Sequence, residues 1–236
     1  MTGVGPAEPD PAARTTEPGP AAGPTEWGEG LVGVGPWEVE HPGEPRPTGD
    51  RWDTELLDAG DRRNVVDRYR YWTREAIVAD LDSRRHPFHV AIENFGHDAN
   101  IGTVVRTANA FLAAEVHIVG RRRWNRRGAM VTDRYQHLRH HEDVSALMAW
   151  AEGRGLPVVA VDNLPGAVPL ETAQLPRECV LLFGQEGPGV SDDARLRADM
   201  TVSIAQFGST RSINAGVAAG IAMHSWVREH AGPFEG

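Results

Sequence analysis

Cysteine and long hydrophobic runs are both scarce in this chain of 236 residues. Its single cysteine, Cys179, excludes an intramolecular disulfide bond and a cysteine-cluster metal site, which fits a reducing compartment. The apolar runs are far shorter than the ~20 residues that a membrane span needs, and the N-terminus shows neither the basic start nor the apolar run of a secretion signal. We therefore expect a cytoplasmic protein without a membrane contact.

Lysine is absent, so all 24 basic residues are arginine. This bias indicates a compositional preference, although the planar guanidinium group is also well suited to phosphate. The net charge of −9 at first argues against a nucleic-acid partner. However, residues 1–60 hold 12 acidic and 3 basic side chains, whereas residues 61–236 hold 21 of each sign. The acidity belongs to the leading segment, and the rest of the chain remains compatible with such a partner.

Composition divides the chain into three parts. Residues 1–50 are rich in Pro, Gly, Ala and Glu, which bury too little apolar surface to fold, so we predict a disordered acidic tail. Residues 51–86 mix apolar positions near helical spacing with arginine and aromatic side chains. This pattern predicts a helical extension. Its arginines and aromatics could hold phosphates and stack bases, but from this stretch alone an ordinary solvated helix face is favoured. Residues 87–236 form the main domain.

In the main domain, short β-rich runs alternate with helical runs. This alternation, with nearly continuous apolar strands, predicts an α/β fold with a parallel sheet covered by helices on both faces. Ligands in this class bind beyond the carboxyl ends of the strands. The predicted strands are residues 88–94, 115–120, 157–163, 179–184 and 200–205, and the predicted helices are residues 99–112, 142–153, 191–197 and 212–230.

The first polar stretch, residues 93–111, runs from a strand end through a polar turn into a helix. Asp98 or Asn100 can cap that helix. On helical geometry, Asn100, Thr103 and Arg106 come near one face. Arg106 stands among apolar residues, where an unpaired charge is costly. We therefore expect Arg106 to have an anionic partner, either a structural carboxylate or a ligand phosphate.

Two further stretches place polar groups after strands. In residues 179–191 a buried strand runs into a glycine-rich turn, where backbone can approach a ligand closely. This turn is neither a Walker loop nor the G-x-G-x-x-G dinucleotide motif. In residues 201–226 a loop rich in hydroxyl and amide groups leads into a helix of small residues, which permits close backbone packing. A plain core helix explains those small residues but leaves the polar loop unexplained.

Together the three stretches resemble the SpoU, or TrmH-like, family of RNA ribose 2′-O-methyltransferases in the SPOUT superfamily. The resemblance covers residues 88–230 and rests on three motifs in the right order: N-x-G-x-x-x-R-T, F-G-x-E-G-x-G-[VL]-S and G-x-x-x-S-[IL]-N. The matching residues are Asn100, Gly102, Arg106 and Thr107, then Phe183 through Ser191, then Gly208, Ser212, Ile213 and Asn214.

The resemblance implies a fold, a cofactor and an assembly. The C-terminal segment is expected to thread through a loop and form a deep trefoil knot. S-adenosylmethionine is expected to bind in a bent form within the knot. The chain is expected to act as a homodimer on tRNA or rRNA. The implied cofactor contacts are Gly184, Gly187, Ile204, Gly208 and Ile213, and the implied catalytic residues are Asn100, Arg106, Glu186, Ser212 and Asn214.

Within that catalytic set, the chemistry of each group indicates its role. Arg106 would orient the ribose hydroxyl and stabilise developing negative charge, because a group with a pKa above ~12 is a poor proton acceptor. The amide and hydroxyl side chains would hold Arg106 and the ribose, while Glu186 would pair with a cation or brace its loop. The family commonly continues Val-Ser-Val-Ala after the third motif, whereas this chain has Ala215-Gly216-Val217-Ala218. This departure concerns helix packing and dimer contacts.

A basic segment follows the second predicted strand. Residues 120–141 hold seven arginines and one acidic residue, with Trp124 and Tyr135 among them. Such a loop beside the first motif would meet the RNA backbone, and its aromatic rings would be available for stacking. The predicted RNA-binding residues are Arg121, Arg122, Arg123, Arg126 and Arg127.

No metal is expected. His137, His140 and His141 lie close together in the sequence but lack a spaced carboxylate or cysteine set, so we expect them on a surface helix or loop rather than at a zinc site.

Two alternatives stay open at this point. The enzyme could act on rRNA, including as an antibiotic-resistance type, instead of on tRNA; the short region before the main domain favours tRNA slightly. The chain could also be a catalytically silent RNA-binding protein with the same fold, which the intact motifs disfavour.

Overall fold

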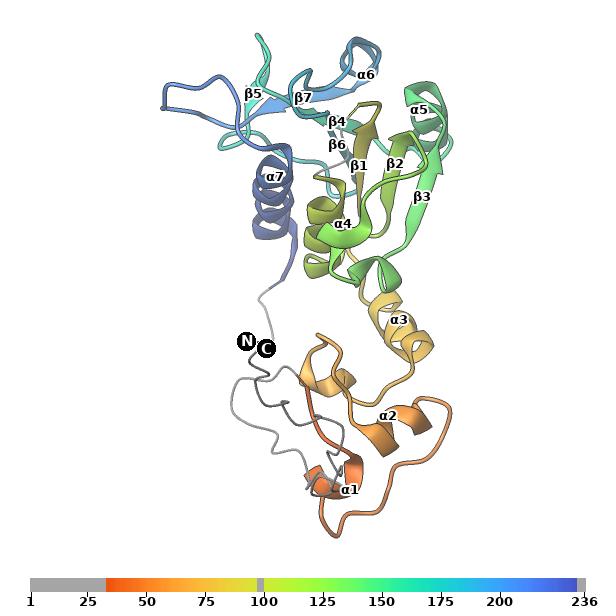
Figure 1. The fold of residues 1–236 in the computed structure, drawn as a ribbon. Coiled ribbons are helices and arrows are strands. Elements are labelled where there is room, and N and C mark those ends of the chain that lie inside the picture. The colour runs from red at the N-terminus through yellow and green to blue at the C-terminus, as the bar shows by residue number, and fades with distance from the viewer. Residues whose placement is uncertain (1–32, 97–99, 233–236) are drawn as a thin grey trace, which may run out of the picture. The chain divides into compact units, whose positions relative to one another are not determined.

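The computed structural model describes residues 33–96 and 100–232, which divide into two compact units. Of the described residues, the smaller unit holds 33–46 and 54–70, and the main unit holds 47–53 and 71–232 (Figure 1). In the described residues no helix is both long and apolar enough to cross a membrane.

Charge pairs organise the smaller unit, which contains α1 (Trp37–Glu40), α2 (Thr54–Ala59) and the 3-10 turn η1 (Asp67–Tyr69). Asp61 is buried and accepts hydrogen bonds from Nε and Nη2 of Arg63 at 2.9 and 2.7 Å. Arg46 bridges two elements, since it pairs with Glu38 of α1 at 2.9 Å and with Asp58 of α2 at 2.5 Å. The buried residues Leu57 and Tyr69 and these charge pairs together hold the unit's segments in place.

Residues 33–50 are ordered, whereas the sequence predicted a disordered tail there. The composition of these residues does not reveal their ion pairs with later residues. The remainder of the predicted tail, residues 1–32, lies outside the described residues. The predicted helical extension, residues 51–86, is divided between the two units. Tyr69 and Tyr71 are buried at 5% and 2% exposure, so they are not available to stack bases.

The main unit is built on a seven-stranded parallel sheet in the order β3-β2-β1-β6-β4-β7-β5, which confirms the predicted α/β class (Figure 1). The five predicted strands are all present within a few residues of their expected bounds. The strands are β1 (Phe88–Asn94), β2 (Val116–Gly120), β3 (Leu138–His141), β4 (Val158–Val161), β5 (Val168–Pro169), β6 (Cys179–Phe183) and β7 (Met200–Ser203).

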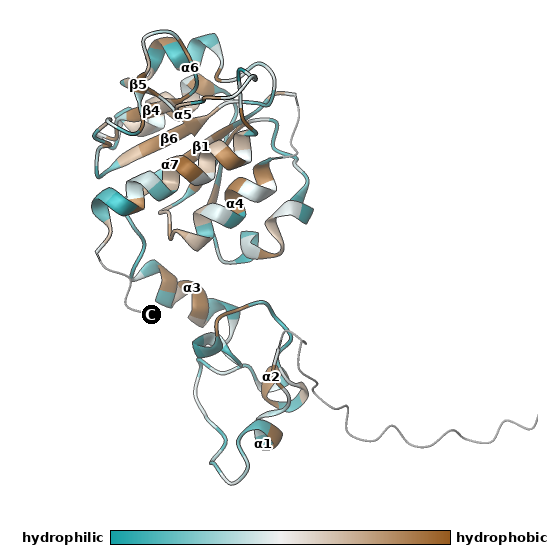
Figure 2. Ribbon diagram, turned by 90° about the vertical axis from the view of Figure 1, so that its left-hand side faces the viewer, coloured by the Kyte–Doolittle hydropathy of each residue, from teal (hydrophilic) through white to brown (hydrophobic). Residues whose placement is uncertain are grey.

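Helices cover both faces of the sheet, each with its own apolar cluster. On one face, side chains such as Val90 and Ile92 of β1 pack with α4 and α7. On the other face, side chains such as Ala91 of β1 and Val119 of β2 pack with α5 and α6. Figure 2 shows hydrophobic strands β1 and β6 behind α4 and α7. The helices of this unit are α3 (Arg74–Asp82), α4 (Ile101–Ala110), α5 (Val144–Glu152), α6 (Asp192–Arg197) and α7 (Ala215–His230).

The two strands that the sequence did not predict are β3 and β5. Leu138–His141 carries one apolar residue among basic ones, so it has neither a buried run nor a clear alternation. The expectation that His140 and His141 lie on a surface helix or loop is therefore wrong. Both are in β3, and His141 is only 6% exposed.

Close backbone contact fixes the position of α4. A methyl group at Gly102 would lie 2.6 Å from the backbone nitrogen of Ala129, so only glycine permits this approach of α4 to the 3-10 turn η2 (Arg126–Ala129). On another side of α4, the side chain of Thr103 contacts Gly216 at the start of α7. The first motif is thereby joined both to the basic segment and to the helix after the third motif.

Candidate active site

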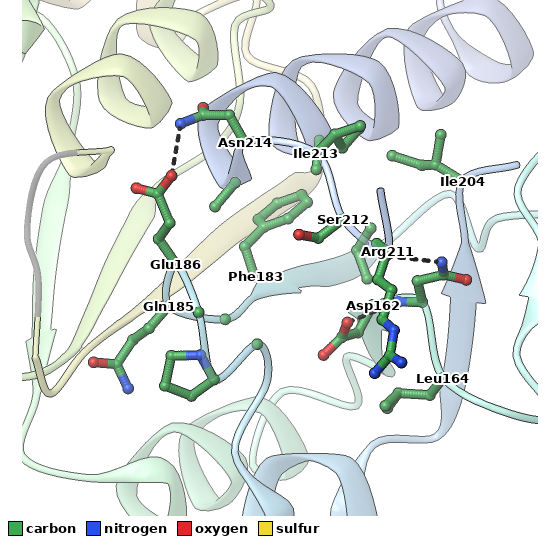
Figure 3. Close-up of a pocket in the computed structure, with 18 of the residues that line it drawn as sticks. Asp162, Leu164, Phe183, Gln185, Glu186, Ile204, Arg211, Ser212, Ile213 and Asn214 are labelled. Atoms are coloured by element: carbon green, nitrogen blue, oxygen red, sulfur yellow. Dashed lines mark hydrogen bonds between the residues drawn. The ribbon is translucent and has the colours of Figure 1, made fainter. Parts of the chain in front are cut away.

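A pocket of about 410 Å³ opens at the carboxyl ends of the central strands, where the parallel fold predicts a ligand site. Its walls are the segments that follow β4, β6 and β7, together with the start of α7 (Figure 3). The lining residues are 161–164, 183–189, 204, 206, 211–215 and 218.

The glycine-rich turn after β6 forms one wall of this pocket. Gln185 and Gly189 exchange two backbone hydrogen bonds of 3.0 Å, which close residues 185–189 into a tight loop. Gly187 and Gly189 have φ values of 93° and 76°, a region that disfavours other residues. A side chain at Gly184 would collide with the backbone of Gly189 and Val190. The loop can therefore present its backbone to a ligand only with glycine at these positions.

Asp162 and Asn163, directly after β4, tie three loops together. The Asp162 carboxylate accepts a hydrogen bond of 2.8 Å from the backbone N–H of Val190, beyond the glycine turn. The Asn163 side-chain amide donates to the carbonyl oxygen of Arg211 at 3.2 Å, in the loop after β7. These two residues were not predicted as site residues. Their position at the carboxyl end of a predicted strand is the signal that could have found them.

A hydrogen-bond network joins the three motifs at the edge of the pocket. The Asn100 amide donates to Glu186 Oε2 at 3.1 Å, and the Asn214 amide donates to Asn100 Oδ1 at 2.9 Å and to Glu186 Oε1 at 3.5 Å. Figure 3 shows Glu186 and Asn214 pointing toward one another. These three residues are 86 and 28 positions apart along the chain, so only the fold brings them together.

Asn214 also begins α7. Its Oδ1 accepts from the backbone N–H groups of Gly216 and Val217 at 2.9 and 3.2 Å, which is the geometry of a helix N-cap. Asn100 precedes α4, but its side chain makes no cap hydrogen bond and instead joins the network. The other predicted cap residue, Asp98, lies outside the described residues.

Most of the predicted site residues line the pocket. Gly184, Gly187, Ile204, Ile213, Glu186, Ser212 and Asn214 all do so. Asn100 reaches the lining through its hydrogen bonds, while Gly208 and Arg106 lie outside it.

The expected partner of Arg106 was a structural carboxylate or a ligand phosphate. Arg106 is exposed on α4, and among residues 33–96 and 100–232 no carboxylate is seen to form an ion pair with it. The buried positions of α4 are Ile101, Val104, Val105 and Ala108, at helical spacing, which places Arg106 on the opposite side. Solvent exposure removes the need for an internal partner, so the guanidinium group can meet an external anion.

The basic segment after β2 is held in place by Asn94, a buried residue at the end of β1. The Asn94 amide donates to the carbonyl oxygens of Arg121 and Arg123 at 2.6 and 3.0 Å. Trp124 is only partly exposed and packs on the core cluster, with Arg126 over its ring at 5.6 Å, so it is less available for stacking than predicted. The five predicted RNA-binding arginines, Arg121, Arg122, Arg123, Arg126 and Arg127, are all exposed.

Glu93 of β1 holds the end of the glycine-rich turn through hydrogen bonds to Ser191. It is 1% exposed and accepts hydrogen bonds from the backbone N–H and the hydroxyl group of Ser191, which caps α6. Burial raises the pKa of the Glu93 carboxyl above its usual range, an effect that the Ser191 hydrogen bonds oppose. A buried acidic side chain thus links β1 to the end of the second motif.

Comparison with known proteins identifies the family. The sequence model of the SpoU rRNA Methylase family matches residues 87–224, and the chain belongs to this family of RNA methyltransferases. The resemblance inferred from the three motifs is thereby confirmed.

The relatives include tRNA (guanosine(18)-2′-O)-methyltransferase of Escherichia coli K12, which is 27% identical over 161 residues, 66% of this chain and 70% of the relative. An uncharacterized tRNA/rRNA methyltransferase of Mycobacterium sp. (strain KMS) is 34% identical over 193 residues, 78% of this chain and 60% of the relative.

Solved structures share the fold of the main unit. The A. aeolicus TrmH/SpoU tRNA modifying enzyme is similar with a TM-score of 0.59 at 21% identity, over 66% of this chain and 81% of that chain. The SpoU methyltransferase AviRb from Streptomyces viridochromogenes, in complex with the cofactor AdoMet, is similar with a TM-score of 0.57 at 23% identity. The similarity covers 72% of this chain and 67% of that chain.

Proposed function

We propose that the protein transfers a methyl group from S-adenosylmethionine to a ribose 2′-hydroxyl of tRNA or rRNA. The observation that carries this proposal is the network of Asn100, Glu186 and Asn214, which joins all three motifs at one edge of the pocket. The 2′-O-methyltransferase activity of the Escherichia coli relative and the AdoMet complex of AviRb support the same reaction.

The pocket fits the proposed cofactor in size and in chemistry. Its volume of about 410 Å³ is in the range of small-molecule sites. Gly184 and Gly187 line the pocket with backbone groups that can make polar contacts, and Ile204 and Ile213 offer apolar contacts. When bound there, S-adenosylmethionine supplies an electrophilic methyl group on a positively charged sulfur. Gly208 remains a predicted contact on the same loop, outside the lining.

Arg106 is assigned to electrostatic stabilisation of the reacting oxygen. It lies six residues after Asn100 on α4, about 9 Å along the helix axis, and helical side chains tilt toward the helix N-terminus. Its exposed guanidinium group can therefore meet an RNA phosphate or ribose that enters from solvent. A group that stays charged cannot accept the hydroxyl proton, so its role is to orient the hydroxyl and to favour an alkoxide-like oxygen.

The remaining motif residues would position the reactants. Asn100 and Asn214 hold each other and the Glu186 carboxylate, so the network keeps three loops in one arrangement while RNA binds. Ser212 lines the pocket with an exposed hydroxyl group that can donate to or accept from the ribose. The exposed arginines after β2 would bind the RNA backbone.

A homodimer is the assembly that we infer. Val217 and Ile221 lie four residues apart on one face of α7, and their exposed fractions are 54% and 40%. An apolar stripe of this kind on a helix of a folded unit is typical of a surface that a second copy covers. Arg106 lies on the neighbouring helix, so the partner copy would stand close to the reacting groups.

A threaded C-terminal segment is also part of the proposal. β7 lies beside β4 and β5, whereas the next helix, α7, packs with α4, which follows β1. The connection from Ile204 to Asn214 must therefore pass the loops after β4 and β6, and the hydrogen bond from Asn163 to Arg211 lies on that passage. This crossing is what a trefoil knot of the expected type requires.

The variant Arg106→Ala tests the proposed mechanism. Loss of one preorganised electrostatic group should lower the rate of methyl transfer to RNA by on the order of 10². Affinity for S-adenosylmethionine, measured by calorimetry, should stay nearly unchanged because Arg106 is outside the pocket lining.

The matched control is Arg195→Ala, an exposed arginine of α6 that pairs with Asp192. Arg195→Ala should leave both the rate of methyl transfer and the affinity for S-adenosylmethionine unchanged. Near-normal turnover of Arg106→Ala would refute the assigned role, and absence of cofactor binding to the unmodified protein would favour a silent RNA-binding protein.

A further inference from the structure

A cluster of imidazole groups lies outside the pocket, on the sheet face covered by α5. His89 of β1, His117 of β2 and His141 of β3 form a chain of hydrogen bonds: His89 Nδ1 to His117 Nε2 at 3.1 Å, and His117 Nδ1 to His141 Nε2 at 2.9 Å. The sheet register places them together, since Ala91 pairs with His117 and Val119 pairs with His141.

A carboxylate completes the cluster. Glu115, just before β2, has its Oε2 at 3.9 Å from His117 Nε2. One donor atom each from His89, Glu115 and His117 lies within 4.8 Å of the other two. Two ligands of a tetrahedral zinc ion, at bond lengths of about 2.0–2.1 Å, are about 3.3 Å apart. The distances of 3.1 and 3.9 Å are close to that value and need only small side-chain movements.

We propose that His89, His117 and Glu115 bind a divalent transition-metal ion of the zinc type. Two imidazoles and one carboxylate are a recurring zinc ligand set, which leaves a fourth position for water. In this arrangement the metal ion takes the place of the proton that His89 and His117 share. The expectation from sequence that no metal is bound is revised by this inference, because the ligands come from two strands with no local spacing to reveal them.

The surroundings of the cluster match those of a metal site. With Nε2 of His117 on the metal, its Nδ1–H donates to His141, and the Arg139 Nε donates to Glu115 at 3.0 Å. Such outer hydrogen bonds orient metal ligands. Trp150 of α5 packs on the ring of His117 at 4.3 Å and excludes solvent.

Position in the sheet indicates a structural ion rather than a catalytic one. His89 lies near the amino end of β1, whereas the pocket lies at the carboxyl ends of the strands. A metal ion there would link β1 to β2, the two strands that lead into the first motif and the basic segment. His89 and Glu115 are only partly buried, so an ion can enter from solvent.

The test is Zn²⁺ binding to the full chain, freed of any histidine tag and treated with a chelator. Calorimetry should show one Zn²⁺ per chain, Co²⁺ should give the visible absorption bands of a tetrahedral site, and Zn²⁺ should raise the Tm. His89→Gln and Glu115→Gln should each weaken Zn²⁺ binding at least tenfold and abolish most of the Tm shift. His89 is the better target because it is half-buried, whereas the fully buried His117 could be needed for folding.

The control is His137→Gln, an exposed histidine that pairs with Asp82 and should bind Zn²⁺ as the unmodified protein does. Far-UV circular dichroism confirms that each variant is folded. The proposal is overturned if the unmodified chain binds no stoichiometric Zn²⁺, or if folded His89→Gln binds it with unchanged affinity. Either result would leave the cluster as a chain of hydrogen-bonded imidazoles.

Discussion

Asn214 shows how one side chain can serve both a helix and a site. Its Oδ1 caps α7, and its amide group donates to Asn100 and Glu186. The cap fixes the direction of the amide, so α7 itself orients the network. In Asn214→Asp the side chain keeps the cap oxygen but loses the amide donor. This substitution therefore separates the cap of α7 from the hydrogen bonds to Asn100 and Glu186.

Glu93 yields a pH-dependence prediction. Its folded pKa is raised above 4.5 by burial, so the folded state loses stability as the pH rises from about 4.5 through the folded pKa. Glu93→Gln cannot ionise there. The stability advantage of the unmodified protein over Glu93→Gln should therefore shrink with rising pH, as measured by urea unfolding at several pH values. An advantage that grows with pH would contradict the buried, desolvated carboxyl.

At the scale of elements, α4 depends on one close approach. Gly102→Ala would place a methyl group 2.6 Å from the Ala129 backbone nitrogen, and backbone cannot move aside cheaply. Overpacking of this kind costs about 1–3 kcal/mol, which should appear as a lower urea midpoint. Gly208→Ala is the control, because a methyl group there meets nothing within 4 Å. Equal stability of the two variants would show that α4 and η2 do not pack this closely.

The basic segment after β2 predicts a salt effect. The triple variant Arg122→Ala, Arg123→Ala and Arg126→Ala should weaken RNA binding and lower the slope of log affinity against log salt by about 2 to 3. Filter binding at several salt concentrations measures both. A control triple variant at Arg177, Arg195 and Arg197, which are exposed elsewhere, should leave the slope unchanged. If the first triple variant also leaves affinity and slope unchanged, RNA docks on another surface.

How far the elements could be predicted depends on local pattern. The central strands were predictable because β4 and β6 are continuous apolar runs and β1 is nearly so, and α4 was predictable from its helical spacing. β3 was not, since its one apolar residue, Leu138, is followed only by basic side chains. For the site, the three motifs predicted Asn100, Glu186 and Asn214, but nothing local indicates that their side chains bond to one another.

Other features could be predicted only with the fold in hand. The solvent exposure of Arg106 follows from which face of α4 is buried, and its apolar neighbours along the chain do not reveal that face. The smaller unit contains ion pairs between distant residues, such as Arg46 with Asp58, which composition does not reveal. His89 and His117 lie 28 residues apart, and only strand pairing makes them neighbours.

At the scale of the whole molecule, the parallel sheet separates two kinds of chemistry. The carboxyl ends of β4, β6 and β7 carry the pocket and the motif loops, while the imidazole cluster lies toward the amino ends of β1 and β2. Reaction and proposed metal binding can thus be tested independently. Loss of the metal site should lower stability first, whereas loss of Arg106 should lower turnover alone.

The most direct test of the central claim is transfer of an isotopically labelled methyl group from S-adenosylmethionine to RNA by the purified protein. tRNA and rRNA substrates are incubated in parallel, digested, and examined by mass spectrometry for modified nucleosides. We predict label on a ribose 2′-oxygen in one of the two RNAs, and almost none with Arg106→Ala. Label on a base, or no label in either RNA while the cofactor binds, would contradict the account.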